Sequence, residues 1–364
     1  MKFRCERDVL LDALATASRG VAGRGGALPV LSGIRFRLIG TRLELAASDL
    51  DLTIRVVTTV TAGNDGVCVL PAKLTTDIVR ALEPGAVTID IDDDQARISS
   101  GRSEFSVRAL VADDFPRLPE PDPSEVSVPA SALVQALKQV VKAASNDDAR
   151  PILTGVLMSS EDDGLRLVAT DSYRLAVCDL VGLELLRSGQ KVLMPSKALS
   201  ELARLLNGVD QVVIHLSDRE ATFDVGNVCL TTRLIEGEFP NYRQLIPQTY
   251  PNRLTVQREA FAEAVRRVKL MAREATPIRL ALRSESVELI AVAQDVGEAR
   301  EVIDAHYEGV EMTVAFNAEY LTDGIEAAVG DEITLDTVDA LKPAVIRPVG
   351  NAGFLYLLMP VRVS

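Results

Sequence analysis

The chain has 364 residues, of which 47% are hydrophobic and 25% are charged, as in an ordinary globular protein. It has neither an apolar run of about 18 residues nor an N-terminal secretory signal, so we expect a cytoplasmic protein with no membrane association. The net charge of −13 argues at first against a nucleic-acid partner, but net charge does not report where charges lie on the surface.

The first elements in chain order are a helix, several short strands and a second helix. Apolar residues recur at helical spacing from Leu10 to Ala17, and residues 34–38 alternate as in an antiparallel strand. A second helix is predicted over 73–82. Four prolines within 116–123 then exclude a regular element, so a domain ends near residue 120.

The same order of motifs then returns. The recurring anchors are Pro29 and Pro151, Asp49 and Asp171, Pro71 and Pro195, and Phe115 and Phe239, at steps of 122, 122, 124 and 124 residues. A fainter third copy follows, and helices are predicted over 133–144, 197–206, 261–271 and 317–328. We therefore expect three repeated domains, 1–120, 126–247 and 252–364, each with two helices packed on antiparallel sheet in an α+β fold. Repetition of this kind suits a curved or ring-like structure.

Cations recur on the predicted helices. They are Lys73 and Arg80, Lys197 and Arg204, Lys138 and Lys142, and Arg266, Lys269 and Arg273. Each set shares one helix face, and equivalent positions carry cations in different repeats. Such a face is either simply solvated or forms a lining that contacts phosphate without reading the base sequence. The recurrence favours the second interpretation, and the scarcity of aromatic residues favours duplex over single-stranded DNA.

The residue patterns predict no catalytic or metal centre. The two histidines, His215 and His306, have no converging partners that the sequence identifies. The acidic run at 90–94 lacks the spacing of a calcium loop and predicts a turn between strands. Four cysteines, Cys5, Cys68, Cys178 and Cys229, match no zinc pattern and predict reduced thiols. We expect no enzyme activity, no cofactor and no metal.

Four segments carry a family resemblance: 169–176 (ATDSYRLA), 238–242 (EFPNY), 317–321 (NAEYL) and 358–362 (LMPVR). Together they resemble the bacterial sliding clamp, the beta subunit of DNA polymerase III, over the whole chain and with an actinobacterial character. The resemblance implies a non-catalytic processivity factor of DNA replication. It also implies a head-to-tail homodimer in which each chain is a half-ring, with helices lining a hole around double-stranded DNA.

The resemblance implies three sets of site residues. The DNA-facing positions are Arg24, Lys73, Arg80 and Lys197. A pocket for short linear motifs of the replicative polymerase, the clamp loader and repair polymerases comprises Leu153, Thr170, Ser172, Tyr173, Arg174, Leu175, Pro240, Leu245, Leu357, Leu358, Met359, Pro360, Val361 and Arg362, in which the arginines orient peptide carbonyls or acidic flanks. The ring-closing interface pairs the edge strand near Phe105 with the helix bearing Leu270 and Met271.

The sequence departs from the family pattern at three positions. Pro151 and Ile152 stand where other clamps have paired tyrosines, so no DNA contact is assigned to them, and Gln244 replaces a basic residue beside the pocket. Three alternatives stay open. They are a second-copy clamp whose altered pocket confers tolerance to a clamp-binding inhibitor, a hydrolase or transferase of three domains, and a non-catalytic scaffold of the same repeats that does not bind DNA.

Overall fold

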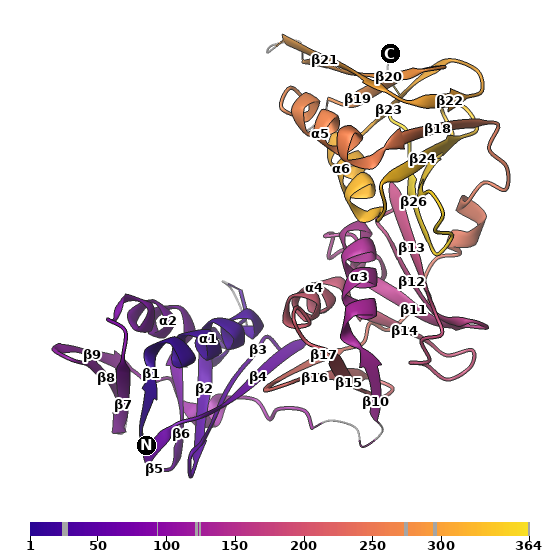
Figure 1. Ribbon diagram of the computed structural model, residues 1–364. Coiled ribbons are helices and arrows are strands. Elements are labelled where there is room, and N and C mark those ends of the chain that lie inside the picture. Colours follow the sequence, from indigo (N-terminus) through magenta and orange to yellow (C-terminus); the bar gives the residue numbers. More distant parts are fainter. Residues whose placement is uncertain are drawn as a thin grey trace. The chain divides into compact units, whose positions relative to one another are not determined.

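The computed structural model describes the chain except for residues 24–27, 93, 121, 122, 124, 273–275, 294–296, 363 and 364. The chain divides into two compact units. The first comprises residues 1–131 and 201–234, and the second comprises 132–200 and 235–364. The division falls inside the predicted second repeat, whose strands are shared between the two units (Figure 1).

The helices lie where the sequence predicted them, from apolar spacing for the first helix of each repeat and from the recurring motifs for the second. They are α1 (Arg7–Ala17), α2 (Ala72–Ala81), α3 (Ala130–Val140), α4 (Ser196–Leu205), α5 (Arg258–Lys269) and α6 (Ala318–Ala327). The Asn317 side chain caps α6 by accepting the backbone N–H groups of Glu319 and Tyr320, which have no partner within the helix. The α5 helix is shorter than predicted: it ends at Lys269, so Leu270 and Met271 follow the helix rather than belong to it.

The first unit contains two antiparallel sheets. The larger has the order β10 (Glu125–Pro129), β15 (Gln211–Leu216), β16 (Glu220–Val225), β17 (Val228–Arg233), β4 (Leu52–Thr59), β3 (Arg42–Ser48), β2 (Gly33–Ile39) and β6 (Gly66–Pro71). The smaller has the order β5 (Thr61–Asn64), β1 (Lys2–Glu6), β7 (Ala86–Asp92), β8 (Gln95–Ser100) and β9 (Ser103–Arg108). Helices α1 and α2 lie side by side over these sheets (Figure 1).

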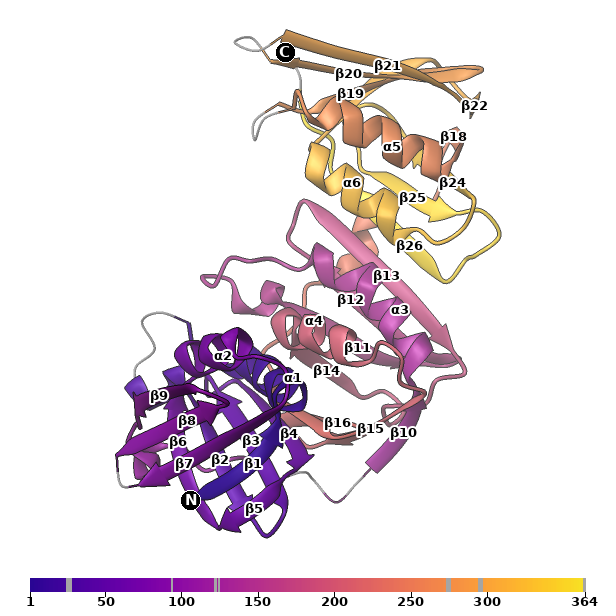
Figure 2. The same ribbon diagram turned by 60° about the vertical axis from the view of Figure 1, so that its left-hand side comes forward.

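The second unit is built in the same way. Its larger sheet has the order β14 (Lys191–Pro195), β11 (Gly155–Glu161), β12 (Gly164–Thr170), β13 (Arg174–Val181), β26 (Phe354–Leu358), β25 (Ala344–Pro348), β24 (Glu332–Thr337), β18 (Asn252–Gln257) and β22 (His306–Glu308). Its smaller sheet has the order β21 (Gly297–Asp304), β20 (Ser286–Ala293), β19 (Ile278–Arg283) and β23 (Met312–Phe316). Figure 2 shows α5 and α6 side by side, with α5 next to the smaller sheet and α6 next to β26.

Each large sheet joins strands from two repeats. In the first unit β4 pairs with β17, and in the second β13 pairs with β26, both antiparallel. The turn before each joining strand is also the same. The Asp49 side chain accepts the backbone N–H groups of residues 51 and 52, and the Asp171 side chain accepts those of residues 173 and 174. Leu50 and Ser172, which follow the two aspartates, both have φ 82°. This repeated and uncommon backbone conformation confirms the duplication that the sequence spacing predicted.

Candidate functional site

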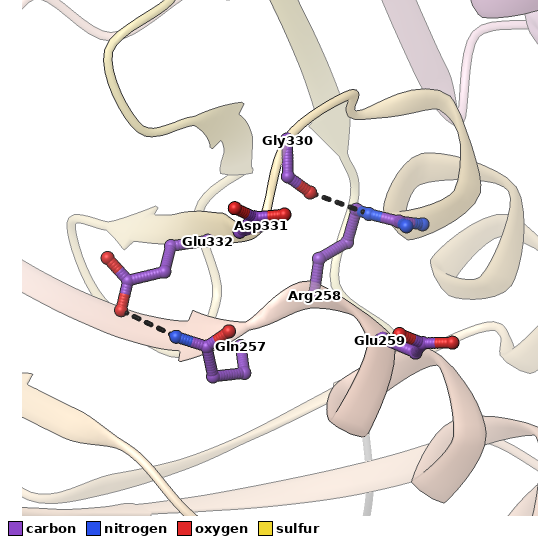
Figure 3. A pocket seen from close by; sticks show the side chains of 6 residues that line it. All are labelled: Gln257, Arg258, Glu259, Gly330, Asp331 and Glu332. Atoms are coloured by element: carbon purple, nitrogen blue, oxygen red, sulfur yellow. Dashed lines mark hydrogen bonds between the residues drawn. The ribbon is translucent and has the colours of Figure 1, made fainter.

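One polar hollow lies where β18 runs into α5 (Figure 3). It is lined by Gln257, Arg258, Glu259, Gly330, Asp331 and Glu332. Arg258 links the two segments that line it. The Arg258 Nε donates to the carbonyl of Gly330 at 2.8 Å, and the Arg258 backbone N–H donates to the carbonyl of Asp331 at 2.8 Å. Arg7 N–H to Gly85 and Ala130 N–H to Asp210 are the corresponding bonds where the other two repeats begin their first helices. The hollow is therefore a structural junction of the repeated fold.

The histidines lie in ordinary structural surroundings. His215 is buried on β15, where its Nε2 is 3.1 Å from Oδ2 of Asp224 on the adjacent strand, and exposed His306 is 3.3 Å from Glu308. Among the residues that the structure describes, no group of three or more His, Cys, Asp or Glu side chains is placed to hold a metal ion. No helix in the described ranges is long and apolar enough to cross a membrane.

Two pairs of the pocket residues predicted from the sequence face one another across β13 and β26, Arg174 with Leu358 and Leu175 with Leu357. Leu175 and Leu357 are directly opposite one another and buried, and they belong to one apolar cluster. The other buried members of the cluster are Leu157, Val168, Val177, Leu193, Tyr242 and Val345, and Ile152, Ile235, Phe239, Ile246, Tyr250 and Leu355 pack against it while remaining partly exposed. Three distant segments, near 152, 240 and 357, thus contribute to one apolar cluster.

Other predicted pocket residues are exposed. Tyr173 has 59% of its surface exposed and Met359 has 40%, and Leu245 and Val361 are exposed as well. Ser172, Pro240 and Arg362 also lie at the surface, and Leu153 and Pro360 are half-buried. The tail that carries Met359 is fixed at two points: the N–H of Met359 donates to Tyr173, and that of Val361 to Ala315. These bonds leave the side chains of Tyr173 and Met359 exposed on a backbone that is held in place.

Five of the predicted pocket residues are buried, namely Leu175, Leu357 and three others. Thr170, Arg174 and Leu358 are buried, and the Thr170 hydroxyl donates to the carbonyl of Arg174 at 2.6 Å. None of these three side chains lies at the surface. Their place in the peptide pocket stays a prediction, since the sequence motif does not show which of its residues strand β26 covers.

The Arg174 guanidinium forms hydrogen bonds to other side chains of the same chain. Its Nε donates to Asp171 at 3.0 Å, its Nη1 donates to Asp323 at 2.6 Å and to the Tyr356 hydroxyl at 3.2 Å, and it lies 4.3 Å from the Tyr320 ring centroid. Burial lowers the pKa of Arg174, but Tyr356, Asp323 and Asp171 outweigh it and raise that pKa above its usual value. These bonds lie within the chain, and a contact of Arg174 with peptide carbonyls stays a prediction. Asp323 and Tyr356 were missed because they lie far from Arg174 in sequence.

The predicted DNA-facing cations differ in their surroundings. Lys73 and Lys197 are exposed in the first turns of α2 and α4. In the described part of the chain Lys73 forms no ion pair, whereas Arg80 pairs with Asp77 at 2.7 Å. The fourth candidate, Arg24, lies outside the described residues.

The predicted interface residues lie on exposed features of each unit. Phe105 is 39% exposed on β9, which is the edge strand of the smaller sheet in the first unit. Leu270 is 83% exposed and Met271 is half-buried, just beyond the end of α5. Strand β21 is the edge of the smaller sheet in the second unit, an exposed edge that the sequence analysis did not single out.

Known proteins match the chain throughout. Family models for the N-terminal, central and C-terminal domains of the DNA polymerase III beta subunit match residues 1–119, 127–241 and 243–362. The beta sliding clamp of Streptomyces coelicolor is 35% identical, with both chains covered in full. Among solved structures, the sliding clamp of Bacillus subtilis has a TM-score of 0.90 at 30% identity. That of Bartonella birtlesii bound to griselimycin has a TM-score of 0.90 at 33%, and both comparisons cover 100% of each chain.

Proposed function

The chain belongs to the DNA polymerase III beta subunit family, the bacterial sliding clamps, and we propose that it is a processivity factor that tethers replication and repair proteins to duplex DNA. It is non-catalytic, and it works as a head-to-tail homodimer that closes around DNA in the cytoplasm. The observation that carries this proposal is the full-length match to all three clamp domains.

We propose the apolar cluster at the β13–β26 joint as the seat for partner peptides. Leu175 and Leu357 form its floor, and Tyr173, Leu245 and Met359 form its exposed rim. Leucine and methionine side chains accept apolar anchors of several shapes, which suits a protein with many partners. Arg174 supports the wall, and Arg362 is the arginine left at the surface to contact acidic flanks of a peptide.

We propose that DNA is held weakly through Lys73, Lys197, Arg80 and Arg24. A ring retains DNA by topology, so a few phosphate contacts without base readout suffice, and strong contacts would slow its movement. Exposure of Lys73 and Lys197 at equivalent helix positions supports this assignment.

We propose that the ring closes by pairing edge strand β9, which bears Phe105, with edge strand β21 of a second copy, with Leu270 and Met271 packed beside them. Unpaired strand edges are natural templates for joining another chain, and exposed Leu270 adds an apolar contact. The domain boundaries stay as proposed, at 1–120, 126–247 and 252–364. Limited proteolysis in the proline-rich segment 116–123 tests the first of them.

Loading onto nicked plasmid circles tests the proposed function. We expect the loaded protein to co-elute with circles through a sizing column at moderate salt and to be released when a restriction enzyme linearises them. Equal retention on linear and circular DNA contradicts the ring mechanism and favours an ordinary DNA-binding scaffold.

A second candidate role, tolerance to a clamp-binding inhibitor, is favoured by the departures at the pocket. Gln244 is exposed next to Leu245, and Ile152 packs against the apolar cluster. Competition between a polymerase peptide and griselimycin tests this role. Tight peptide binding with weak griselimycin binding supports it, and tight binding of both contradicts it.

A further inference from the structure

Asp323 on α6 bridges two cations that come from different elements. Its Oδ1 is 3.1 Å from Nζ of Lys142, and its Oδ2 is 2.6 Å from Nη1 of Arg174. The Lys142 side chain is 52% exposed, whereas those of Asp323 and Arg174 are 14% and 9% exposed. One carboxylate therefore joins a surface cation to a buried one within the second unit.

The buried side of this bridge leads to the pocket rim. Arg174 donates to Oδ2 of Asp171, and Oδ1 of Asp171 accepts the N–H groups of Tyr173 and Arg174 at 2.9 and 3.0 Å. The Tyr173 carbonyl then accepts the N–H of Met359. Arg174 thus fixes the carboxylate that shapes the turn, and the turn positions both exposed rim side chains.

The exposed side of the bridge faces solvent on the helix layer. Lys142 also lies 3.1 Å from Glu326, which is 3.5 Å from Arg266 on α5. Burial lowers the pKa of Lys142, but Asp323 and Glu326 outweigh it and raise that pKa, so the ammonium stays charged. A DNA phosphate reaching this face competes with the carboxylates for Lys142, because ion pairs of half-exposed side chains are weak.

We propose that Asp323 is a positioning residue that couples phosphate contact at Lys142 to the affinity of the peptide pocket, an inference that rests on the proposed function. When phosphate draws Lys142 away, Asp323 no longer shares its charge with a second cation, so its pair with Arg174 strengthens. A guanidinium held more tightly between Asp171 and Asp323 orders the turn at Ser172 more firmly, so less ordering remains for the peptide to impose. DNA therefore raises peptide affinity, and by linkage the peptide raises DNA affinity by the same factor.

The test measures the affinity of a fluorescein-labelled polymerase peptide for the full dimer, free and loaded on nicked plasmid circles. For the wild type we expect about fivefold tighter binding on DNA, the lower end of typical coupling. Lys142→Met keeps the apolar stem and removes the charge. We expect it to bind peptide without DNA as tightly as the loaded wild type does, and to show no further gain on DNA. Asp323→Asn is expected to bind peptide more weakly and to lose the response to DNA.

Glu326→Gln is the matched control, since Glu326 contacts Lys142 but has no bond to Arg174 among the described residues. It is expected to keep the DNA response. Because Asp323→Asn perturbs a buried ion pair, the folding of this variant is checked by thermal unfolding. If Asp323→Asn is unstable, the comparison of Lys142→Met with the wild type decides the test. If the wild type is retained on circles and binds the peptide with the same affinity whether free or loaded on DNA, the coupling is overturned and the proposed function is left intact. A wild type that neither binds peptide nor stays on circles overturns both.

Discussion

The backbone N–H of Met359 donates to the carbonyl of Tyr173 at 2.9 Å, and the corresponding bond at the other joint, from Arg233 to Asp51, is also 2.9 Å. The two joints between repeats therefore share one backbone geometry. Their side chains differ, because the cross-strand pair Leu175 and Leu357 of the second joint is replaced at the first by two threonines.

The threonine joint offers no comparable apolar floor. The Thr53 hydroxyl lies 2.9 Å from that of Ser48, and the Thr231 hydroxyl lies 2.9 Å from that of Thr222. These buried hydroxyls satisfy one another, and an apolar anchor placed on them gains less than one placed on leucine. The duplication thus produced two similar joints, of which one is suited to bind a hydrophobic peptide.

Shortening Met359 is expected to weaken peptide binding. Met359→Ala removes an exposed rim contact without affecting the backbone bond to Tyr173, so we expect a loss of about 1–2 kcal/mol, or roughly 5- to 30-fold in Kd. Fluorescence anisotropy with the polymerase peptide measures it. Val349→Ala, at a half-exposed apolar position after β25, is the control, and an equal loss in both variants contradicts the assignment of the rim.

The cations of α2 are expected to contribute unequally to DNA binding. Lys73→Ala should reduce the slope of log affinity against log salt by about 1, because a lysine without a carboxylate partner neutralises one phosphate. Arg80→Ala should change the slope less, since Asp77 already pairs with Arg80. Salt titrations of duplex binding by each variant measure both slopes. A larger effect from Arg80 would show that its pair with Asp77 opens on DNA.

A charge at Leu270 is expected to break the dimer. Leu270→Glu places a carboxylate where we propose an apolar contact, and the dimer dissociation constant should rise by about 10- to 100-fold. Sedimentation velocity over a dilution series measures it. Val310→Glu places the same charge at another highly exposed apolar residue, and this variant should stay dimeric. A Leu270→Glu protein that sediments as the wild type does would place the interface elsewhere.

Burial of two thiols is expected to lower the free energy of unfolding at high pH. Burial raises the pKa of Cys68 and of Cys178 from 9.0 to about 12. Between those values the unfolded thiols ionise while the folded ones stay protonated, so this contribution to stability is complete below pH 9.0 and is lost as the pH rises toward 12. Urea unfolding across this range measures the slope.

The Cys68→Ala/Cys178→Ala variant isolates the thiol contribution, because burial also raises the pKa of Tyr307 and Tyr320, which act in the same direction. Its free energy of unfolding should fall less steeply with pH than that of the wild type. Equal slopes would mean that the thiols ionise alike in the folded and unfolded states.

The sequence by itself determined the repeats and the helices. Apolar spacing located the first helix of each repeat, because the face that packs on a sheet must recur every three or four residues. The recurring motifs located the second helix, and both signals are local. The recurring Asp49 and Asp171 marked the two turns because the bonds they accept span only three residues. The motif around Arg174 indicated a functional region for the same reason: its residues are consecutive.

Only the tertiary structure decided which of those residues are exposed and what they contact. Arg174 reaches Asp323 across 149 positions, so no spacing rule links the two. The pairing of β13 with β26 buries Leu358 and leaves Met359 exposed, although the two are adjacent. Strands pair through backbone groups that nearly every residue carries. The partner of a strand is therefore determined by the packing of the whole unit rather than by the strand's own amino-acid sequence.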